Sequence, residues 1–364
     1  GTKVSKNGLV VKVPTWRATK DISVPEDLVE EISRIYGYDN FEPKLPVFDI
    51  IPPKVNCLRQ FQYKVLDVLV KELDYTEVYN YSFVSNEQIK NIGNNVEKYI
   101  ELDNPISKEK PYLRRSLLLN LLENINKNIE FFDELKIVET GKVFLSEQDG
   151  EETNKDGKEK LPKQDLILSS LYASKKDKNP FWQVRRVVES LDQEFKMGVE
   201  LKEINKPCHW LHSSRSAKIL IGDSRVGFVY ELNPLIAKKF GLDVRVGVVE
   251  LNLNELIKFD RTNEINYKPL PIYPEIVRDL AFVVKQEINH QDIMKVLGKI
   301  DGLLKEVKVF DVYVGKNIGE GYKSMAYRLV YGSDDRTLKN EEIDLVQKKV
   351  VKILEDKFGI EVRG

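Results

Sequence analysis

Apolar and polar positions follow two different periods in the last hundred residues. Three stretches alternate residue by residue, as strands do: RDLAFVV (278–284), VKVFDVYV (307–314) and KSMAYRLVYG (323–332). Two stretches repeat apolar positions at helical spacing: HQDIMKVLGKI (290–300), with Asn289 as its predicted cap, and NEEIDLVQKKVVKILEDKF (340–358). With IEVRG (360–364) as an edge strand, the order βαββαβ predicts a ferredoxin-like sheet whose two helices cover one face.

The region before residue 262 mixes both periods. One helical stretch, 58–73, has apolar residues on one side: Leu58, Phe61, Val65, Leu69 and Leu73. Further helices are predicted over 115–132 and 181–195, and strand-rich segments over 76–83, 136–145, 165–174, 217–233 and 244–253. We expect a mixed, largely antiparallel sheet with helices, and we interpret 151–163 as a solvated hairpin loop.

The first forty residues predict a smaller unit. VVKVPTW (10–16) is typical of a strand that ends at Pro14, and Ser23 to Glu26 form a capping-box pattern with Pro25 in the first turn. The helix that follows should end at Gly37. FEPKLPVFDIIPPK (41–54) carries four prolines and no period, which predicts an extended linker. Because the chain opens on this strand pattern without Met, we expect a fragment of a longer protein.

Composition limits the possible functions. The 364 residues have room for two or three domains. Together with the helices and strands predicted above, this length makes α+β multidomain the expected fold class. The net charge is -1, from 57 basic and 58 acidic residues, so any nucleic-acid contact must come from a local surface. Two cysteines make no disulfide framework, no apolar run reaches membrane-spanning length, and we expect a cytoplasmic protein.

The strands of the C-terminal sheet should point alternate side chains toward and away from the two helices. The set expected on the helix-covered side is Leu280, Phe282, Val284, Phe310, Val312, Val314, Met325, Tyr327, Leu329 and Tyr331. The set expected on the open side is Ala281, Asp311, Tyr313, Ser324, Ala326 and Arg328. The open face therefore combines small residues, one aromatic ring, one carboxylate and one arginine.

This open face is suited to single-stranded RNA. Tyr313 would stack on a base, Asp311 would accept hydrogen bonds from guanine, and Arg328 or the nearby Lys323 would hold phosphate. The small side chains would let a base approach the sheet. The alternative is an ordinary solvated sheet face. The pattern alone favours that alternative, since ferredoxin-like folds host many functions.

A second candidate site is the acidic cluster of residues 21–31. Asp21, Asp27, Glu30 and Glu31 fall around the start of one short helix, and crowded carboxylates of this kind suit Mg²⁺. A structural role is the alternative: acidic residues stabilise a helix N-terminus, and Glu30 can pair with Arg34 at i, i+4.

The middle region offers little chemistry of its own. No GxxxxGK phosphate loop is present, so ATP binding through such a loop has no support in the sequence. The i, i+3 pair His209 and His212 lacks a convincing third ligand, which favours packing over a metal site. For Arg114 and Arg115 we favour structural ion pairs over contacts with RNA phosphate. His290, near the predicted helix cap, is interpreted as structural.

Four strings together resemble one known family. They are VPTWR…EDLVEEISRIYGYDN, YLRRSLLLNLLENINKNIEFFDELKIVETGKVF, HWLHSSRSAKILI…VGFVYELNP and RDLAFVV…VFDVYVG…GYKSMAYRLVYGSDDRTLKNEEI. In this order they resemble the C-terminal half of the bacterial-type phenylalanyl-tRNA synthetase beta subunit, over nearly the whole chain.

The resemblance implies three domains: the end of a small domain (1–43), a catalytically silent class II synthetase-like domain (44–262) and an anticodon-binding domain (270–364). It also implies pairing with an alpha subunit, two alpha and two beta subunits in all, and contact with the guanine of the tRNA(Phe) anticodon through the open face. ATP would be used by the complex and not bound by this fragment. A Mg²⁺ site, whose shell the alpha subunit could share, would fall on Asp21, Asp27, Glu30 and Glu31, although WRATKD places Asp21 two residues beyond the family's usual spacing.

Two rival functions belong to other classes. A stand-alone RNA-binding protein derived from this subunit would keep the open face and lose its partner. An independent metal-dependent enzyme would use the acidic cluster, but no nucleophile or general base is placed beside those carboxylates.

Overall fold

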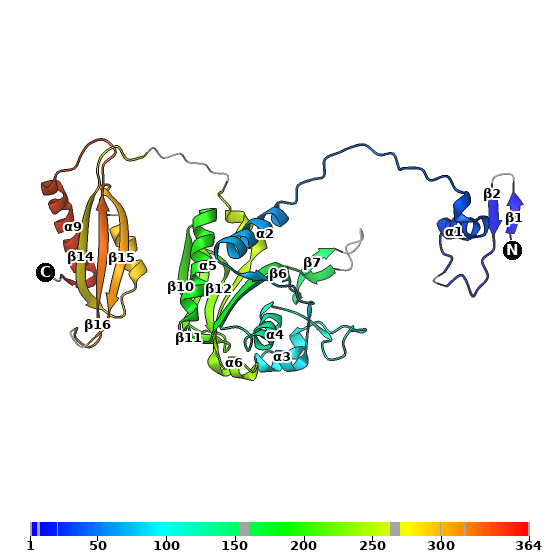
Figure 1. Cartoon of the computed structure of the whole chain (residues 1–364), viewed down its shortest axis with the longest axis horizontal. Coiled ribbons are helices and arrows are strands. Elements are labelled where there is room, and N and C mark those ends of the chain that lie inside the picture. Colours follow the sequence, from blue (N-terminus) through cyan, green and yellow to red (C-terminus); the bar gives the residue numbers. More distant parts are fainter. Residues whose placement is uncertain are drawn as a thin grey trace. The chain divides into compact units, whose positions relative to one another are not determined.

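The computed structural model of the chain describes residues 2–5, 8–19, 21–152, 160–262, 270–298, 300–315 and 318–362. The chain divides into two compact units, Gly1–Arg261 and Thr262–Gly364. Figure 1 traces the elements of each unit along the chain. The tip of the predicted loop at 151–163 lies outside the described residues, but the strands flanking it, β7 (Leu145–Glu152) and β8 (Lys160–Lys163), do pair as an antiparallel hairpin.

The N-terminal part is a hairpin and one helix. Strands β1 (Thr2–Ser5) and β2 (Gly8–Val11) pair antiparallel, so the strand predicted to reach Pro14 stops earlier. Helix α1 (Pro25–Tyr36) begins at the predicted proline and is followed by Gly37. None of the residues of α1 is buried, and Ile35 is 80% exposed. The predicted linker is confirmed: residues 41–56 contain no helix or strand.

A seven-stranded sheet forms the centre of the first unit. Its strand order is β10-β11-β12-β13-β9-β6-β3, and every pairing is antiparallel except that of β3 with β6. The strands are β3 (Thr76–Glu77), β6 (Glu134–Lys142), β9 (Leu166–Ser174), β10 (Val199–Glu203), β11 (Leu211–Ile221), β12 (Ser224–Leu232) and β13 (Arg245–Asn252). The predicted largely antiparallel sheet is confirmed. The segment 76–83 contributes less than expected, since β3 has two residues and β4 (Phe83–Val84) pairs only with β5 (Tyr112–Leu113).

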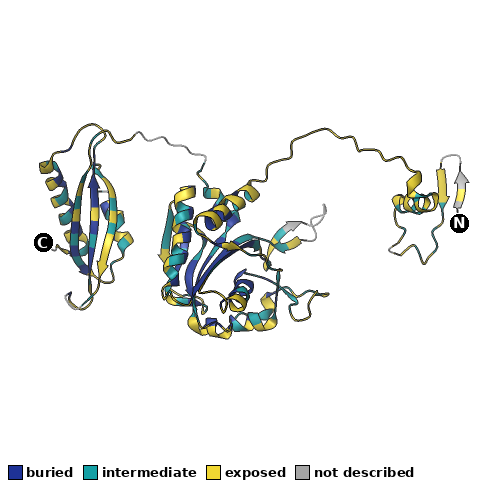
Figure 2. Cartoon of the chain, viewed as in Figure 1, coloured by how far each residue is buried: buried dark blue, intermediate teal, exposed yellow. Residues whose placement is uncertain are grey.

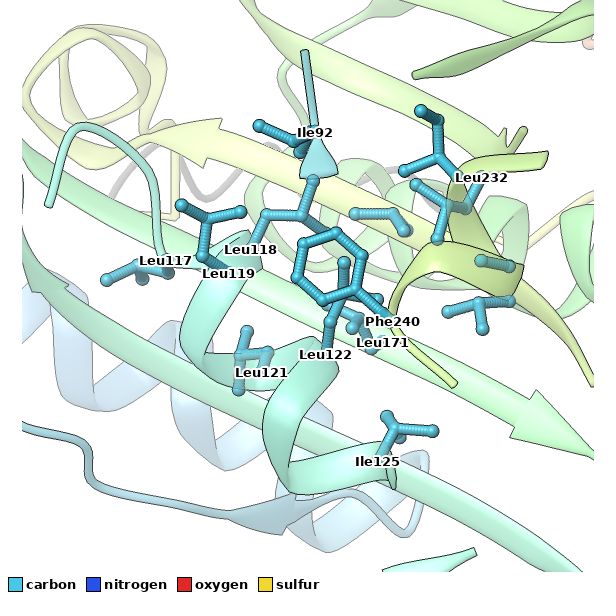
Figure 3. Packing of buried hydrophobic residues seen from close by; sticks show 14 of the residues in the cluster. Ile92, Leu117, Leu118, Leu119, Leu121, Leu122, Ile125, Leu171, Leu232 and Phe240 are labelled. Carbon is cyan, nitrogen blue, oxygen red and sulfur yellow. The ribbon is translucent and has the colours of Figure 1, made fainter. Parts of the chain in front are cut away.

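Helices cover both faces of this sheet. The helices are α2 (Cys57–Asp67), α3 (Asn86–Asn91), α4 (Leu118–Asn128), α5 (Pro180–Phe195), α6 (Pro234–Lys239) and α7 (Leu253–Leu256), with a π-helical turn at Val68–Glu72 after α2. On one face α2 and α5 pack against the strands, with Phe61 in contact with Phe195. On the other face α4 buries Leu118, Leu122 and Ile125 in the same hydrophobic cluster as Phe240 (Figure 3). In Figure 2 the dark strands of the first unit are this buried layer.

The second unit has the predicted βαββαβ order. Strands β14 (Ile276–Lys285), β15 (Leu304–Tyr313), β16 (Tyr322–Tyr331) and β17 (Glu361–Val362) form an antiparallel sheet in the order β15-β16-β14-β17. Helices α8 (His290–Leu297) and α9 (Asn340–Phe358) complete it. The expected inward residues of β14 and β16 are confirmed as buried: Leu280, Phe282, Val284, Met325, Tyr327, Leu329 and Tyr331. IEVRG supplies the edge strand, as predicted.

One strand of this sheet departs from regular alternation. Val309 pairs with Tyr327, but the next pair along is Asp311 with Ala326, so Phe310 is an extra residue in β15. Phe310 is 54% exposed, and its ring lies under the guanidinium of Arg328 on the open face. The prediction that Phe310 points toward the helices is therefore wrong, because a bulge shifts its side chain to the other face. Val312 pairs with the buried Met325, yet Val312 and Val314 are also exposed and not covered by helices.

Among the residues that the structure describes, no helix has both the length and the apolar character needed to cross a bilayer.

The contact between β13 and α5 has no room for a side chain at Gly247. A Cβ there would lie 2.5 Å from the Pro180 carbonyl oxygen and 2.9 Å from Val184 Cγ1. We expect Gly247→Ala to lower the free energy of unfolding of the first unit by about 1–3 kcal/mol, because backbone must move apart. Urea unfolding followed by tryptophan fluorescence measures this, since all three tryptophans precede residue 262.

Ser224→Ala is the control in the same unit, since Ser224 is an exposed residue at the start of β12. Equal effects of the two substitutions would contradict the close packing of α5 on β13.

Candidate nucleic-acid interface

Cross-strand pairing builds the open face of the C-terminal sheet in rows. Residues paired across antiparallel strands share a face, so each row is read from the register. Ala281, Ala326 and Asp311 form one row across β14, β16 and β15, and Val283, Ser324 and Tyr313 form the next. The register thus brings together most of the residues predicted for RNA, with small side chains beside the carboxylate and the ring.

Asp311 and Tyr313 are the accessible polar groups of these rows. Asp311 is exposed, and it has no hydrogen-bond or ion-pair partner within the described part of the chain. The ring of Tyr313 is 44% exposed and lies against Gly315, where any Cβ would collide with the phenol. An unpaired carboxylate beside a half-exposed ring is an arrangement that can take a base: the acid accepts hydrogen bonds and the ring stacks.

Arg328 lies in the same face but is already paired. Its Nε and Nη2 donate to Asp279 Oδ1 and Oδ2, each at 2.9 Å, and this pairing lowers the pKa of Asp279. The guanidinium carbon also lies 5.3 Å from the centroid of the Phe310 ring. Phe310 is thus a second aromatic ring of the face. Period-two alternation could not find it, since only the register shift brings it there.

Two predicted contacts need correction. Ser324 is on the open side by register, but it is only 8% exposed, because it lies in the middle strand between Val283 and Tyr313. Lys323 pairs with the buried Val284 and so belongs to the helix-covered side. Its Nζ donates to the carbonyls of Gln286 (3.1 Å) and Ile288 (2.6 Å), and desolvation lowers the pKa of this amine. Lys323 is therefore occupied within the chain and not presented to phosphate.

The acidic cluster of the N-terminal part is arranged differently from the prediction. Asp27 caps α1: its Oδ2 accepts the backbone N–H groups of Ser23 (2.6 Å) and Val24 (2.9 Å), which lowers its pKa. The capping box thus lies one residue later than predicted, with Val24 at the N-cap and Asp27, not Glu26, as its acidic residue. The charge-assisted bonds to the backbone leave this carboxylate turned toward the helix N-terminus.

Arginines compensate the other carboxylates of the cluster. Glu31 accepts from Arg17 Nη2 and from Arg34 Nη2, both at 2.7 Å, so Arg34 pairs with Glu31 and not with the predicted Glu30. Arg17 Nε also donates to Asp21 at 2.7 Å. Among the described residues no three His, Cys, Asp or Glu side chains are grouped as metal ligands. These carboxylates bind arginines and the N-terminal backbone of α1, and they do not form a coordination shell for Mg²⁺. The magnesium site therefore remains a prediction that this arrangement does not support.

The remaining candidates have structural partners. Arg114 Nη1 donates to Glu139 Oε1 at 2.7 Å in a buried pair, and Arg115 pairs with Glu147, as predicted. His209 Nε2 lies 2.6 Å from the Ile92 carbonyl oxygen, whereas His212 contacts Ser214 and Arg215.

In the second unit, Asn289 occupies the N-cap position of α8 without a side-chain hydrogen bond. The neighbouring His290 stacks on Tyr327, with its Nδ1 2.9 Å from the phenol oxygen. The structural interpretation of His290 is therefore confirmed.

Comparison with known proteins gives three family matches. Residues 1–38 match the tRNA synthetase B5 domain, residues 42–253 the phenylalanyl tRNA synthetase beta chain CLM domain, and residues 271–363 the ferredoxin-fold anticodon binding domain. A solved structure of pyrrolysyl-tRNA synthetase from Desulfitobacterium hafniense is similar with a TM-score of 0.44 and 13% identity, covering 58% of this chain and 74% of that one.

Curated relatives match along almost the whole chain. The phenylalanine–tRNA ligase beta subunit of Staphylococcus aureus (strain bovine RF122 / ET3-1) is 32% identical over 360 residues, which cover 96% of this chain and 43% of that protein. That of Fusobacterium nucleatum is 32% identical over 365 residues, with 96% and 44% covered. The chain thus spans less than half the length of these relatives. Because the CLM-domain match spans more than half of the chain, it belongs to the phenylalanine–tRNA ligase beta subunit family.

Proposed function

We propose that this chain is the non-catalytic beta-subunit region of a phenylalanine–tRNA ligase that reads the anticodon of tRNA(Phe). The observation that carries the proposal is the free carboxylate of Asp311, placed between the rings of Phe310 and Tyr313 on the uncovered sheet face. The complex would use ATP and Mg²⁺ to attach phenylalanine, would contain two alpha and two beta subunits, and would act in the cytoplasm. The domain limits 1–43, 44–262 and 270–364 are part of this proposal.

The chemistry of Asp311 favours guanine over the other bases. The Watson–Crick edge of guanine carries two neighbouring N–H donors, and a carboxylate accepts both. Adenine and cytosine present a donor beside an acceptor on that edge, so one carboxylate oxygen would face an acceptor. Small side chains at Ala281 and Ala326 leave room for the base edge next to the acid.

The two rings give this contact its affinity. Phe310 and Tyr313 flank Asp311 in sequence and are both about half exposed, so each can stack on an unpaired base. Stacking of a base on an aromatic side chain contributes about 1–3 kcal/mol. Arg328 adds a positive charge over one face of the Phe310 ring, partly neutralised by Asp279.

For the middle domain we propose a scaffolding role beside the alpha subunit, with no catalytic group. Arg114 and Arg115, the arginines that precede α4, are held by Glu139 and Glu147. A buried pair such as Arg114 with Glu139 is suited to holding a strand and a loop in register, since removal of either partner leaves an uncompensated charge.

Co-expression with an alpha subunit tests the proposal. We expect the two chains to co-purify, and we expect Asp311→Ala to reduce charging of tRNA(Phe) at limiting tRNA while amino-acid activation is unchanged. If the chain binds tRNA but never co-purifies with an alpha subunit, the rival function of a stand-alone RNA-binding protein is correct.

Loss of either ring should weaken tRNA binding. We expect Phe310→Ala and Tyr313→Ala each to cost about 1–3 kcal/mol of binding free energy, because each removes one stacking surface. Fluorescence anisotropy with a labelled tRNA(Phe) anticodon stem-loop measures the dissociation constant. Leu345→Ala is the control, since Leu345 is equally apolar and 69% exposed but lies on α9. A Phe310→Ala variant that binds like the control would remove Phe310 from the interface.

Lys323 should matter for stability and not for RNA. We expect Lys323→Ala to leave tRNA affinity within about twofold and to lower the free energy of unfolding by about 1 kcal/mol, because two carbonyls lose their donor. Arg328→Ala is the comparison, with weaker tRNA binding expected. Should both variants weaken binding equally in the anisotropy assay, Lys323 contacts the RNA and its assignment to the covered side is wrong.

A further inference from the structure

A second site lies in the first unit, on the sheet face that carries α4. Two adjoining cavities of about 510 Å³ and 240 Å³ open there, and both are lined by Arg225, Phe228 and Glu250. The larger volume is within the range of pockets that hold a small molecule, about 300–1,000 Å³. Neither the anticodon face nor the acidic cluster uses these residues.

The strand register places a cationic, an aromatic and an acidic side chain in one row along the floor of the larger cavity. Lys218 of β11 pairs with Phe228 of β12, and Phe228 pairs with Glu250 of β13. Neighbouring strands are about 4.8 Å apart, so the Cα atoms of Lys218 and Glu250 are about 10 Å apart with the ring between them. A cation, an aromatic ring and an acid therefore follow one another across three strands.

The acid end is fixed by two hydroxyl groups. Glu250 accepts from Ser116 Oγ at 2.5 Å and from Tyr230 Oη at 2.8 Å. Burial raises the pKa of Glu250 above its usual range. Held in this way, the carboxyl group can take one further hydrogen bond from an N–H donor in the cavity, as carboxylates have more than two acceptor sites.

The opposite end is positively charged and not neutralised. Lys206, Lys218 and Arg225 line the larger cavity, and within the described part of the chain none of the three pairs with a carboxylate. Lys218 is instead the cross-strand partner of Lys202 on the neighbouring strand β10. Glu203 is the other acidic residue of the lining, and it is exposed. Like charges opposed on neighbouring strands destabilise a sheet, and a bound anion would relieve that repulsion.

The ring between the two ends offers a stacking surface. Phe228 is half-buried, and the guanidinium carbon of Arg225 lies 5.0 Å from its centroid. Trp210 adds a further aromatic wall to the same cavity. A planar ligand ring that stacked on Phe228 would lose water from the face in contact with that ring.

We propose that this cavity binds a nucleoside monophosphate, with the base on Phe228, its N–H edge at Glu250 and its phosphate at Lys218 and Lys206. The order of cation, ring and acid along the row is the reason for choosing this ligand. A nucleotide has its flat ring between an N–H edge and the anion, whereas an aromatic amino acid has both charged groups at one end and its ring beyond them. The site needs no glycine-rich phosphate loop, and the binding proposed involves no reaction.

Isothermal titration calorimetry on the whole chain tests this with AMP, adenosine, inorganic phosphate and phenylalanine. We expect AMP to bind saturably in the millimolar range or tighter, and adenosine to bind about tenfold more weakly because it lacks the charge-assisted contacts. Phosphate should compete weakly, and phenylalanine should neither bind there nor displace AMP. Absence of saturable AMP binding, or displacement of AMP by phenylalanine, overturns the proposal.

Variants locate the site. Lys218→Ala should weaken AMP binding about tenfold, because it removes one charge-assisted phosphate contact. Lys90→Ala is the control: Lys90 is an exposed lysine of α3 that lines neither cavity, and its loss should change AMP affinity less than about twofold. Equal effects of the two variants would mean nonspecific attraction and would overturn the site.

Phe228→Leu checks the ring, with tryptophan fluorescence reporting whether the fold is kept. Weaker AMP binding by a folded variant supports stacking, and unchanged binding overturns it; if this variant unfolds, Lys218→Ala still decides. Lys218→Ala should leave anisotropy with the anticodon stem-loop unchanged, so this proposal and the anticodon proposal fail separately.

Discussion

Antiparallel hydrogen bonding determines which side chains of this chain can act together, because residues paired across two strands share a face. In the C-terminal sheet the pairs Ala281 with Ala326 and Ala326 with Asp311 place a carboxylate beside two methyl groups. In the seven-stranded sheet the pairs Lys218 with Phe228 and Phe228 with Glu250 place a cation and an acid on either side of a ring. A shift of one residue in the register of either sheet would send these side chains to opposite faces and remove the site on that sheet.

Charge compensation within the chain then decides which polar groups remain available. Glu31 and Asp21 are held by Arg17, Asp279 holds Arg328, and the amine of Lys323 is held by two carbonyls. Asp311 in the C-terminal sheet and Lys218 in the middle sheet have no such partner within the described residues. Groups with free hydrogen-bonding capacity at a surface are the ones that a ligand can satisfy, and here they lie beside aromatic rings.

Much of this arrangement follows from the sequence. Alternation in 278–284 and 323–332 identified the buried faces of β14 and β16, and the βαββαβ order identified the fold of the second unit. The bulge at Phe310 could not be predicted, because it depends on hydrogen bonding to β16 and leaves no mark on local hydrophobicity. Lys323 was offered to phosphate because it adjoins Ser324, although alternation places it on the same side as Met325 and Tyr327, where its amine donates to loop carbonyls. The Mg²⁺ site was inferred from carboxylates that are close in sequence. That proximity does not reveal that Arg17 folds back to pair with Asp21 and Glu31.

The register of β15 is tested most directly by thiol accessibility. Cysteine would be introduced singly at Val309, Phe310 and Asp311 in a chain whose two exposed cysteines, Cys57 and Cys208, are replaced by serine, and the rate of maleimide modification measured with and without tRNA(Phe). The bulge predicts rapid modification at both 310 and 311, slowed by tRNA, and slow modification at 309, which faces the helices. Slow modification at 310 together with rapid modification at both 309 and 311 would mean regular alternation and would contradict the two-ring face around Asp311.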